Sequence, residues 1–288
     1  MGTKGTLGIL NPFEGFKHFS LQRESPPPDL APFVEGFWSV RWDLEGRPPF
    51  EQEVLPYPCV NLSSGIDGFE VHGPGTERFV AQLSGRGAVF GTKFTPAGFF
   101  AFTHIPMCEL VDGIVSAEAA TGRAPRRPKS ADFGTMRAEV EAFLRSFRPA
   151  HTEQMALADR LVRLAQEDRS IARAEDLARA AGSSVRTLHR LFERHVGVGP
   201  KWIVRRSRVQ EAAERVARGG RVDWARAAQE LGYHDQAHFI RDFRAQVGFT
   251  PTVYARRCAT STQIASVDSA DRGHPSPQAS RSNARPPN

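Results

Sequence analysis

The last third of the chain repeats itself at a step of 50 to 51 residues. Ala178 and Gly182 recur as Ala228 and Gly232, at an offset of 50. Five more residues recur at an offset of 51, with Arg190, Phe192, Val196, Gly197 and Pro200 returning as Arg241, Phe243, Val247, Gly248 and Pro251. A step of this length is typical of one supersecondary unit used twice, and two copies are too few for a solenoid. The fold therefore has to contain a duplicated unit, whose second copy holds one extra residue.

The first copy predicts a short helix, a glycine turn and a second helix. The first helix opens near Ala174 with two acidic residues in its first turn, where negative charge suits the helix dipole. Gly182 ends it because glycine adopts the left-handed conformation at little cost, and Ser183 or Ser184 caps the next helix. That helix carries an apolar stripe at helical spacing, formed by Val185, Leu188, Leu191, Phe192 and Val196. This order indicates a helix-turn-helix motif, whose second helix lies in the major groove of DNA.

Residues off the two apolar stripes are candidate base contacts. In the first copy these are Arg186, His189 and Arg190, which can all donate hydrogen bonds. In the second copy Asp235 is placed to cap the helix, and the candidates are Gln236, Ala237, Ile240 and Arg241. Glutamine can pair with adenine, and isoleucine can contact a thymine methyl group. Residues 200–219 are predicted to form one helix between the copies, which would hold two recognition helices about one turn of DNA, roughly 34 Å, apart.

These residues bring out a family resemblance. Residues 169–257 resemble the DNA-binding domain of the AraC/XylS family of bacterial transcription regulators, through LARAAGSSVRTLHRLFERHVGVGPKWIVRRSRVQEA and above all through AAQELGYHDQAHFIRDFRAQVGFTPTVYARR. The resemblance implies that the seven candidate residues read double-stranded DNA in successive major grooves. It places Arg208 in the connecting helix, where it braces the domain or contacts a phosphate. For an activator it also implies RNA polymerase as a partner.

Two other classes of function stay open at this point. A single helix-turn-helix pattern also occurs by chance in small helical bundles, so the repeat could bind a protein partner. Alternatively, an enzyme could be joined to the same DNA-binding domain, such as a repair protein with a reactive cysteine. The recurrence of Arg190 as Arg241 favours DNA, because a bundle core does not require matched arginines.

The charge distribution favours DNA binding as well. Residues 169–257 hold 18 Lys and Arg against 9 Asp and Glu, whereas residues 1–125 hold 9 against 14. Basic charge confined to one domain is the electrostatic signature of nucleic-acid binding. A membrane-binding patch would need a basic helix with exposed aromatic residues, and here the aromatic residues occupy core positions.

The N-terminal half shows short strand-like runs separated by Pro and Gly, and no strong helical period. The runs are Phe33–Trp42, Glu53–Leu55, Cys59–Leu62, Gly68–His72, Phe79–Leu83, Ala88–Phe94 and Gly98–Phe102. They predict a sandwich or barrel, and the whole chain as α+β with an all-α C-terminal domain. LPYPCVNLSSG, GTKFTPAGFFAF and HIPMCELVDGIV resemble the sensory domain of one branch of AraC-like regulators. That resemblance implies a cupin-like barrel that binds a small-molecule effector.

Candidate chemistry in this half is sparse. The histidines are far apart and no His-x-His plus Glu cluster exists, so we expect no metal, cofactor or catalytic site. Cys59 lies in an apolar run and is more typical of a core thiol than of a nucleophile. Most of the dense aromatic residues are expected in the core. Trp38 and Phe99, which flank strand ends near Pro or Gly, are the candidates for an effector pocket.

Two amphipathic helices are predicted between the halves. Phe133, Met136, Val140, Phe143, Leu144 and Phe147 mark the first, and Met155, Ala158, Leu161, Val162 and Ala165 mark the second. They either pack within the chain or, as the family resemblance suggests, pair two subunits in a homodimer.

These patterns divide the chain into four segments. They are an effector-sensing β domain (17–125), a helical linker (126–166), the double helix-turn-helix domain (167–257) and a disordered tail (258–288). Three widely spaced cysteines form no disulfide framework, and neither a signal peptide nor a long apolar stretch is present, so we expect a cytoplasmic protein without membrane contact.

Overall fold

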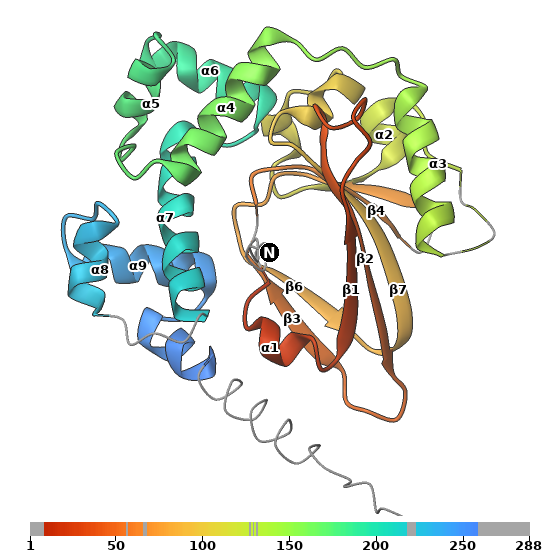
Figure 1. Ribbon diagram of the computed structural model, residues 1–288, viewed down its shortest axis with the longest axis horizontal. Helices are drawn as coiled ribbons and strands as arrows, with labels where there is room; N and C mark the ends of the chain where they lie inside the picture. Colours follow the sequence, from red (N-terminus) through yellow and green to blue (C-terminus); the bar gives the residue numbers. More distant parts are fainter. Residues whose placement is uncertain are drawn as a thin grey trace, which may run out of the picture.

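The computed structural model describes residues 9–55, 57–65, 68–126, 128, 130, 132–217 and 223–258. A β-rich N-terminal part is followed by an all-helical C-terminal part, and the two lie side by side (Figure 1). This confirms the predicted α+β class. Across the described residues, no helix combines the length and the apolar character that crossing a bilayer requires. The predicted tail lies outside the described residues from position 259 onward.

Among the described residues, the β strands form two antiparallel sheets. They are β1 Phe19–Glu24, β2 Val34–Leu44, β3 Phe50–Val54, β4 Asn61–Ser64, β5 Phe69–His72, β6 Phe79–Leu83, β7 Gly85–Phe94 and β8 Ile114–Ser116. Six strands have the order β1-β2-β7-β4-β5-β8, and β3 pairs with β6 in the second sheet. A small apolar cluster of Ile9, Phe19, Leu44 and Leu83 joins the two sheets, as in a sandwich.

The pairing of β2 with β7 explains two glycines. Trp38 lies opposite Gly91 and Trp42 lies opposite Gly87. A Cβ atom on either glycine would come within 2.2 Å of the indole ring opposite it. The glycines are therefore required where each tryptophan crosses the neighbouring strand.

The first amphipathic helix, α3 Phe133–Arg145, covers the other face of the large sheet (Figure 1). The Phe133 ring packs edge-on against Phe90 with ring centroids 5.4 Å apart. The exposed side of α3 carries only small or polar residues such as Thr135 and Ala138. The second helix, α4 Glu153–Glu167, likewise buries its apolar face and exposes charged residues. Both apolar faces are thus used within the chain, which was one of the two predicted alternatives.

One predicted strand is wrong. Gly98–Phe102 forms a 3₁₀ helix, η1, rather than a strand. With three residues per turn, a 3₁₀ helix places Phe99 and Phe102 on the same side, and both are buried, whereas a strand would point them to opposite faces. Gly98 allows the tight approach, since a Cβ there would lie 2.0 Å from the Phe33 carbonyl oxygen. Strands β1 and β8 were not predicted, because neither has a continuous apolar run of strand length.

The C-terminal helices follow the duplicated pattern. They are α5 Ala174–Ala180, α6 Val185–His195, α7 Pro200–Ala217, α8 Trp224–Glu230 and α9 Gln236–Val247, followed by a helical segment over 251–258. Because α4 packs against α5, α6 and α7, the boundary at 166/167 cuts through a helix of this domain. Cys258, assigned to the tail, lies in the helical segment over 251–258 and is buried in the second core cluster. We therefore call residues 153–258 the helical domain and residues 9–145 the β domain.

Several contacts between described residues join the two domains, among them the following three, and the Tyr57 hydroxyl of the β domain also donates to Gln166 Oε1 of α4 at 2.9 Å. Asp159 of α4 accepts hydrogen bonds from Ala97 N (2.8 Å) and Thr95 Oγ1 (3.0 Å) beside η1. The His195 ring, at the end of α6, stacks on Phe100 of η1 with centroids 4.5 Å apart. The third fastening is an ion-pair cluster in which Glu53 of β3 binds Arg78 and Arg257, and both guanidinium groups lie over the Phe249 ring.

Candidate nucleic-acid interface

The first helix-turn-helix unit consists of α5, a turn and α6. Asp176 stabilises the start of α5 by accepting hydrogen bonds from the backbone N–H groups of residues 172 and 173. Gly182 in the turn has φ 59°, in the left-handed region. Of the two predicted caps, the structure uses Ser184, whose Oγ accepts from Thr187 N at 3.1 Å. The unit thus has the order and caps that the sequence predicts.

The second unit repeats this construction with α8 and α9. Asp223 caps α8, Gly232 has φ 76°, and Asp235 caps α9 by accepting from His238 N at 2.7 Å. The N-cap residue follows the turn glycine by two positions in the first unit (Gly182 and Ser184) and by three in the second (Gly232 and Asp235). The extra residue of the second copy therefore lies in the turn. Tyr233 there is buried, with its ring edge-on to Phe239 at 5.3 Å. The longer turn therefore adds a core residue to the second unit.

The candidate base contacts lie largely as predicted on the outer sides of α6 and α9. Arg186, Arg190, Gln236, Ala237 and Arg241 are exposed, and His189 is half-buried. Ile240 differs, because it is half-buried and packs against the core cluster of the second unit. Only part of its side chain is therefore open to a thymine methyl group.

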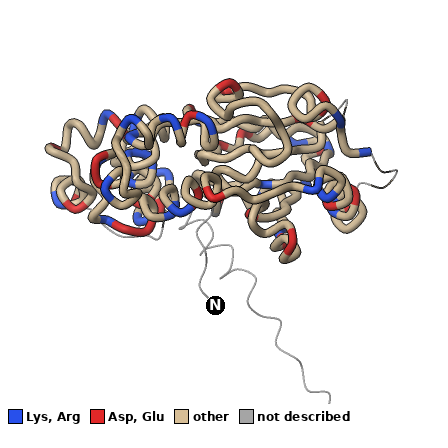
Figure 2. Tube along the Cα trace, turned by 90° about the horizontal axis from the view of Figure 1, so that it is seen from above, with Lys and Arg blue, Asp and Glu red and all other residues tan. Residues whose placement is uncertain are grey.

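Several arginines of the helical domain are held by acidic side chains, and others are not. Arg169, Arg179, Arg205, Arg215 and Arg226 each form an ion pair with an acidic side chain. By contrast, none of Arg186, Arg190 and Arg241 forms a hydrogen bond or ion pair with any residue that the structure describes. Figure 2 shows how Lys and Arg are denser along the helical domain than along the β domain. These three guanidinium groups, which form no hydrogen bond or ion pair with a described residue, are therefore available to an anionic ligand.

Arg208 is not part of this surface. It is 4% exposed, and its Nη2 atom donates to the carbonyl oxygens of Arg169 (3.0 Å) and Ile171. Burial lowers the pKa of Arg208 from its ordinary value. Of the predicted roles, the structure supports bracing, since the guanidinium ties α7 to the loop between α4 and α5. Its assignment to the DNA-contact set is wrong because the side chain is enclosed by the protein.

The two candidates for the effector pocket, Trp38 and Phe99, both pack against other residues of the β domain. Phe99 is buried in the main core, edge-on to Phe94 at 5.0 Å. Trp38 packs across Gly91 and donates from Nε1 to Asn61 Oδ1 at 3.3 Å. Both residues are thus explained by packing of the β domain.

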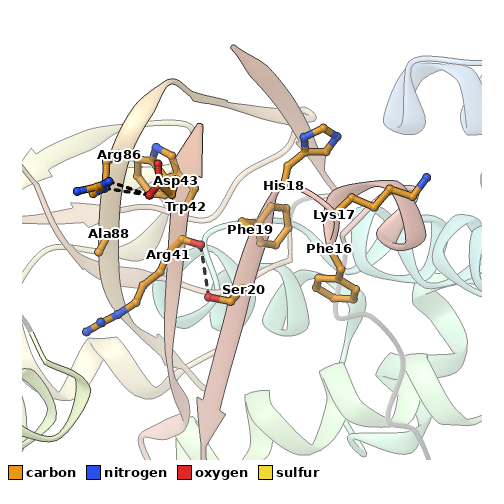
Figure 3. A pocket seen from close by; sticks show the side chains of 11 residues that line it. Phe16, Lys17, His18, Phe19, Ser20, Arg41, Trp42, Asp43, Arg86 and Ala88 are labelled. Carbon is orange, nitrogen blue, oxygen red and sulfur yellow. Dashed lines mark hydrogen bonds and ion pairs between the residues drawn. The ribbon is translucent and has the colours of Figure 1, made fainter. Parts of the chain in front are cut away.

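A concavity lies elsewhere in the β domain, across β1, β2 and β7 (Figure 3). It is a shallow surface hollow of about 630 Å³. The Arg41 and Lys17 side chains point away from each other there, and Arg86 is bound to Asp43. A small enclosed void of about 20 Å³ lies nearby under α3. The side chains of the hollow do not converge on one ligand, and among the described residues no group of His, Cys, Asp and Glu could hold a metal ion.

Two features of the domain contact escaped sequence reasoning. Asp159 is a carboxylate within the buried stripe of α4, next to Ala158 and one turn before Val162. An acid inside an apolar stripe is a signal that it has a partner elsewhere in the fold. His195 gave no such signal, because its burial depends on the position of η1. Burial, and then the nearby Arg194 charge, lower the pKa of His195 to about 4.

The families that match the chain cover its β domain and its helical domain separately. Residues 22–116 match a family described as a domain of unknown function (DUF6597), and residues 177–257 match a family described as a helix-turn-helix domain. The first match spans most of the β domain, and the second contains most of both repeat copies. The duplicated unit found in the sequence is therefore recognised as one helix-turn-helix domain.

Individual relatives are more distant. The transcriptional activator NphR of a Rhodococcus species is 29% identical over 213 residues, which cover 73% of this chain and 58% of that protein. Among solved structures, ToxT from Vibrio cholerae O395 is 12% identical with a TM-score of 0.39, covering 84% of this chain and 98% of that one. The C-terminal domain of AraT, a response regulator from Geobacillus stearothermophilus, is 21% identical with a TM-score of 0.34, covering 36% and 88%.

Proposed function

We propose that this chain is a sequence-specific DNA-binding regulator of transcription of the AraC/XylS type, because residues 177–257 match a helix-turn-helix family and a relative is a transcriptional activator. In this proposal α6 and α9 enter successive major grooves, and α7 sets the distance between them. The single observation that carries the proposal is the pair of matched helices on which exposed Arg186, Arg190 and Arg241 form no hydrogen bond or ion pair with a described residue. Arginine is the most frequent base-specific contact, through the O6 and N7 atoms of guanine.

Most of the affinity in this proposal comes from phosphate contacts. The helical domain holds an excess of basic residues, and neutralising phosphates releases condensed counterions. We therefore expect binding to weaken steeply as salt rises. Sequence choice should depend on the residues at the exposed sides of α6 and α9.

A DNA-selection experiment with the full chain at moderate salt tests the proposal. The expected product is a sequence with two short preferred blocks, separated by about one helical turn. The same selection with residues 150–258 should enrich the same blocks, because this fragment keeps α4 in the core of the helical domain. No enrichment by a folded full chain would refute sequence-specific binding and favour a helical module that binds a protein.

We further infer that the β domain senses a small-molecule effector and passes the signal to α6. Support comes from the direct contact of η1 with the end of α6, through Phe100 and His195. A ligand changes DNA affinity only if it binds one arrangement of the two domains better than the other. A compound screen by thermal shift, followed by DNA titration with and without each hit, tests this. Hits that bind the β domain but leave DNA affinity unchanged would contradict the coupling.

We also propose that the chain has no catalytic step of its own. The alternative of a repair-type enzyme would use a reactive cysteine, and the β domain holds the buried Cys59 and the exposed Cys108. Burial raises the pKa of Cys59 to about 12, so its thiolate form is scarce at neutral pH. An alkylation assay with a DNA alkyl donor tests this point, because a stoichiometric transfer to Cys59 or Cys108 would restore the enzyme alternative.

Finally, we infer that α3 and α4 serve packing within the chain rather than a homodimer. Their apolar faces are buried, and their exposed sides carry small or charged residues. Sedimentation of the full chain at high micromolar concentration should show a monomer, and a stable dimer would contradict this inference.

The name of the Rhodococcus relative supports activation of transcription, in which case RNA polymerase is a partner. A reporter with the selected site distinguishes activation from repression.

A further inference from the structure

The second recognition helix is tied to the connecting helix by an ion pair that the first lacks. Asp242 of α9 accepts hydrogen bonds from Arg205 of α7, with Nε 2.7 Å from Oδ2 and Nη2 bonded to Oδ1. At the repeat offset of 51 residues, the counterpart of Asp242 in the first unit is Leu191, which packs against the main core. The second unit therefore has a carboxylate where the first has an apolar side chain.

The surroundings of this carboxylate make it more than a surface ion pair. Asp242 is 5% exposed, and the Arg205 side chain is 44% exposed. His238 lies on the same helix with Nε2 3.7 Å from Asp242 Oδ2, and the Tyr233 ring is edge-on to His238 at 5.3 Å. The pKa of Arg205 is raised, first by its hydrogen bond to Asp242, and burial and the Asp242 charge raise the pKa of Tyr233. One buried carboxylate thus interacts with His238 of α9 and with Arg205 of α7, and its charge also acts on Tyr233 in the turn.

An apolar residue at this position would pack the two helices at a lower cost in desolvation free energy. Removing a carboxylate from water costs free energy that its ion pair offsets only when the geometry is good. A bidentate pair between arginine and a carboxylate has both hydrogen bonds in one plane, and so it restricts the orientation of the two side chains. Apolar contacts of α9 with α7 allow small rotations that this pair resists.

From this contrast we propose that Arg205 and Asp242 are positioning residues that fix the rotation of α9 against α7. They thereby determine which spacing between two DNA half-sites the chain accepts. The proposal rests on the proposed function, because spacing has meaning only if both recognition helices bind DNA. Neither residue needs to touch a base for this role, since the pair acts through the orientation of α9.

The test uses the full chain and a set of duplexes whose two selected blocks are separated by the preferred spacing or by one or two base pairs more or fewer. Each base pair shifts the second block by about 3.4 Å and rotates it by about one tenth of a turn. Asp242→Asn is the primary variant, since it removes the charge with little change in shape and leaves Arg205 partly exposed to water. Arg205→Lys keeps the charge but loses the bidentate geometry. Asp29→Asn is the matched control, because Asp29 accepts a bidentate pair from Arg145 in the β domain and is 54% exposed.

We expect the wild type and the Asp29→Asn control to bind the duplex with the preferred spacing at least about fivefold more tightly than duplexes with one base pair more or fewer. This factor corresponds to the cost of one mismatched base pair. Asp242→Asn and Arg205→Lys should reduce this preference to less than about twofold, while binding at the best spacing stays within a few fold. The doubly exchanged variant, Arg205→Asp with Asp242→Arg, should restore part of the preference.

Two results would overturn the inference. One is a spacing preference that both variants keep unchanged, and the other is an equal loss of affinity at every spacing, which a merely structural role predicts. Thermal melting is recorded for each protein, and Arg205→Lys carries the test alone if Asp242→Asn does not fold. A wild type that selects no sequence would refute the proposed function itself, which separates the two failures.

Discussion

Truncation of Asp159 tests how strongly the two domains are fastened. Its carboxylate is 8% exposed and accepts hydrogen bonds from Ala97 N and Thr95 Oγ1. Hydrogen bonds to a charged group contribute about 1.5–3 kcal/mol each, and a buried N–H left without an acceptor costs about 1–3 kcal/mol. Part of this is offset because the variant no longer has to bury a charge. We therefore expect Asp159→Ala to lower the free energy of unfolding by about 2–4 kcal/mol.

Asp159→Asn provides the matched control. Its side-chain oxygen can still accept from Ala97 N, and its amide can donate to Thr95 Oγ1, so we expect a loss below about 1 kcal/mol. Chemical denaturation of the full chain measures both variants against the wild type. Equal stability of Asp159→Ala and the wild type would refute the reasoning, because it would mean that the contact contributes nothing.

The difference in stability between the wild type and Asp159→Asn should depend on pH. Burial raises the pKa of Asp159 above its ordinary 3.8, so the native state holds this proton more readily than the unfolded chain does. The stability that the protonated group contributes is full below about pH 3.8 and is lost as the pH rises through the raised pKa. The wild type should therefore lose stability relative to Asp159→Asn over this window. A difference that does not change with pH would contradict the assignment of the shift to burial.

Three further predictions concern the helical domain and the thiols. Arg190→Ala or Arg241→Ala should cost about 1–3 kcal/mol at the selected site and relax one position in it, measured by DNA titration, whereas a uniform loss over all sequences would mean phosphate contact only. Gly232→Ala should lower the free energy of unfolding by about 1 kcal/mol because its φ of 76° is strained for alanine, and an unchanged melting curve would contradict this. The exposed Cys108 should react with a thiol reagent before the buried Cys59 does, and equal rates in the folded protein would contradict the burial of Cys59.

The duplicated domain could be predicted from the sequence because its structure is determined locally. Glycine turns, caps and apolar stripes lie within a few residues of one another, so Gly182, Ser184 and Asp235 have the predicted roles. The connecting helix was predicted for the same reason. The position of Ile240 is an exception, since the core that half-buries it depends on how α9 packs.

The β domain was less predictable because its contacts join residues far apart in the chain. Gly98–Phe102 has the composition of a strand, but its two buried phenylalanines face one core. Trp38 and Phe99 were chosen as pocket residues because they flank strand ends near Pro or Gly, and their packing partners, Gly91 and Phe94, could not be identified without the strand register. The contact between the domains was missed entirely, since neither surface carries a local pattern that names the other.

The unequal halves of the repeat give any DNA complex of this chain a direction. A protein that binds as two identical subunits recognises a palindrome and lies on it the same way in either sense. Here α6 and α9 differ in sequence, and α7 joins them in a fixed order. Inverting the site would turn the whole molecule around and carry the β domain to the opposite side of the half-sites. The orientation of such a DNA site relative to the start of a gene therefore matters as much as the base sequence of the site.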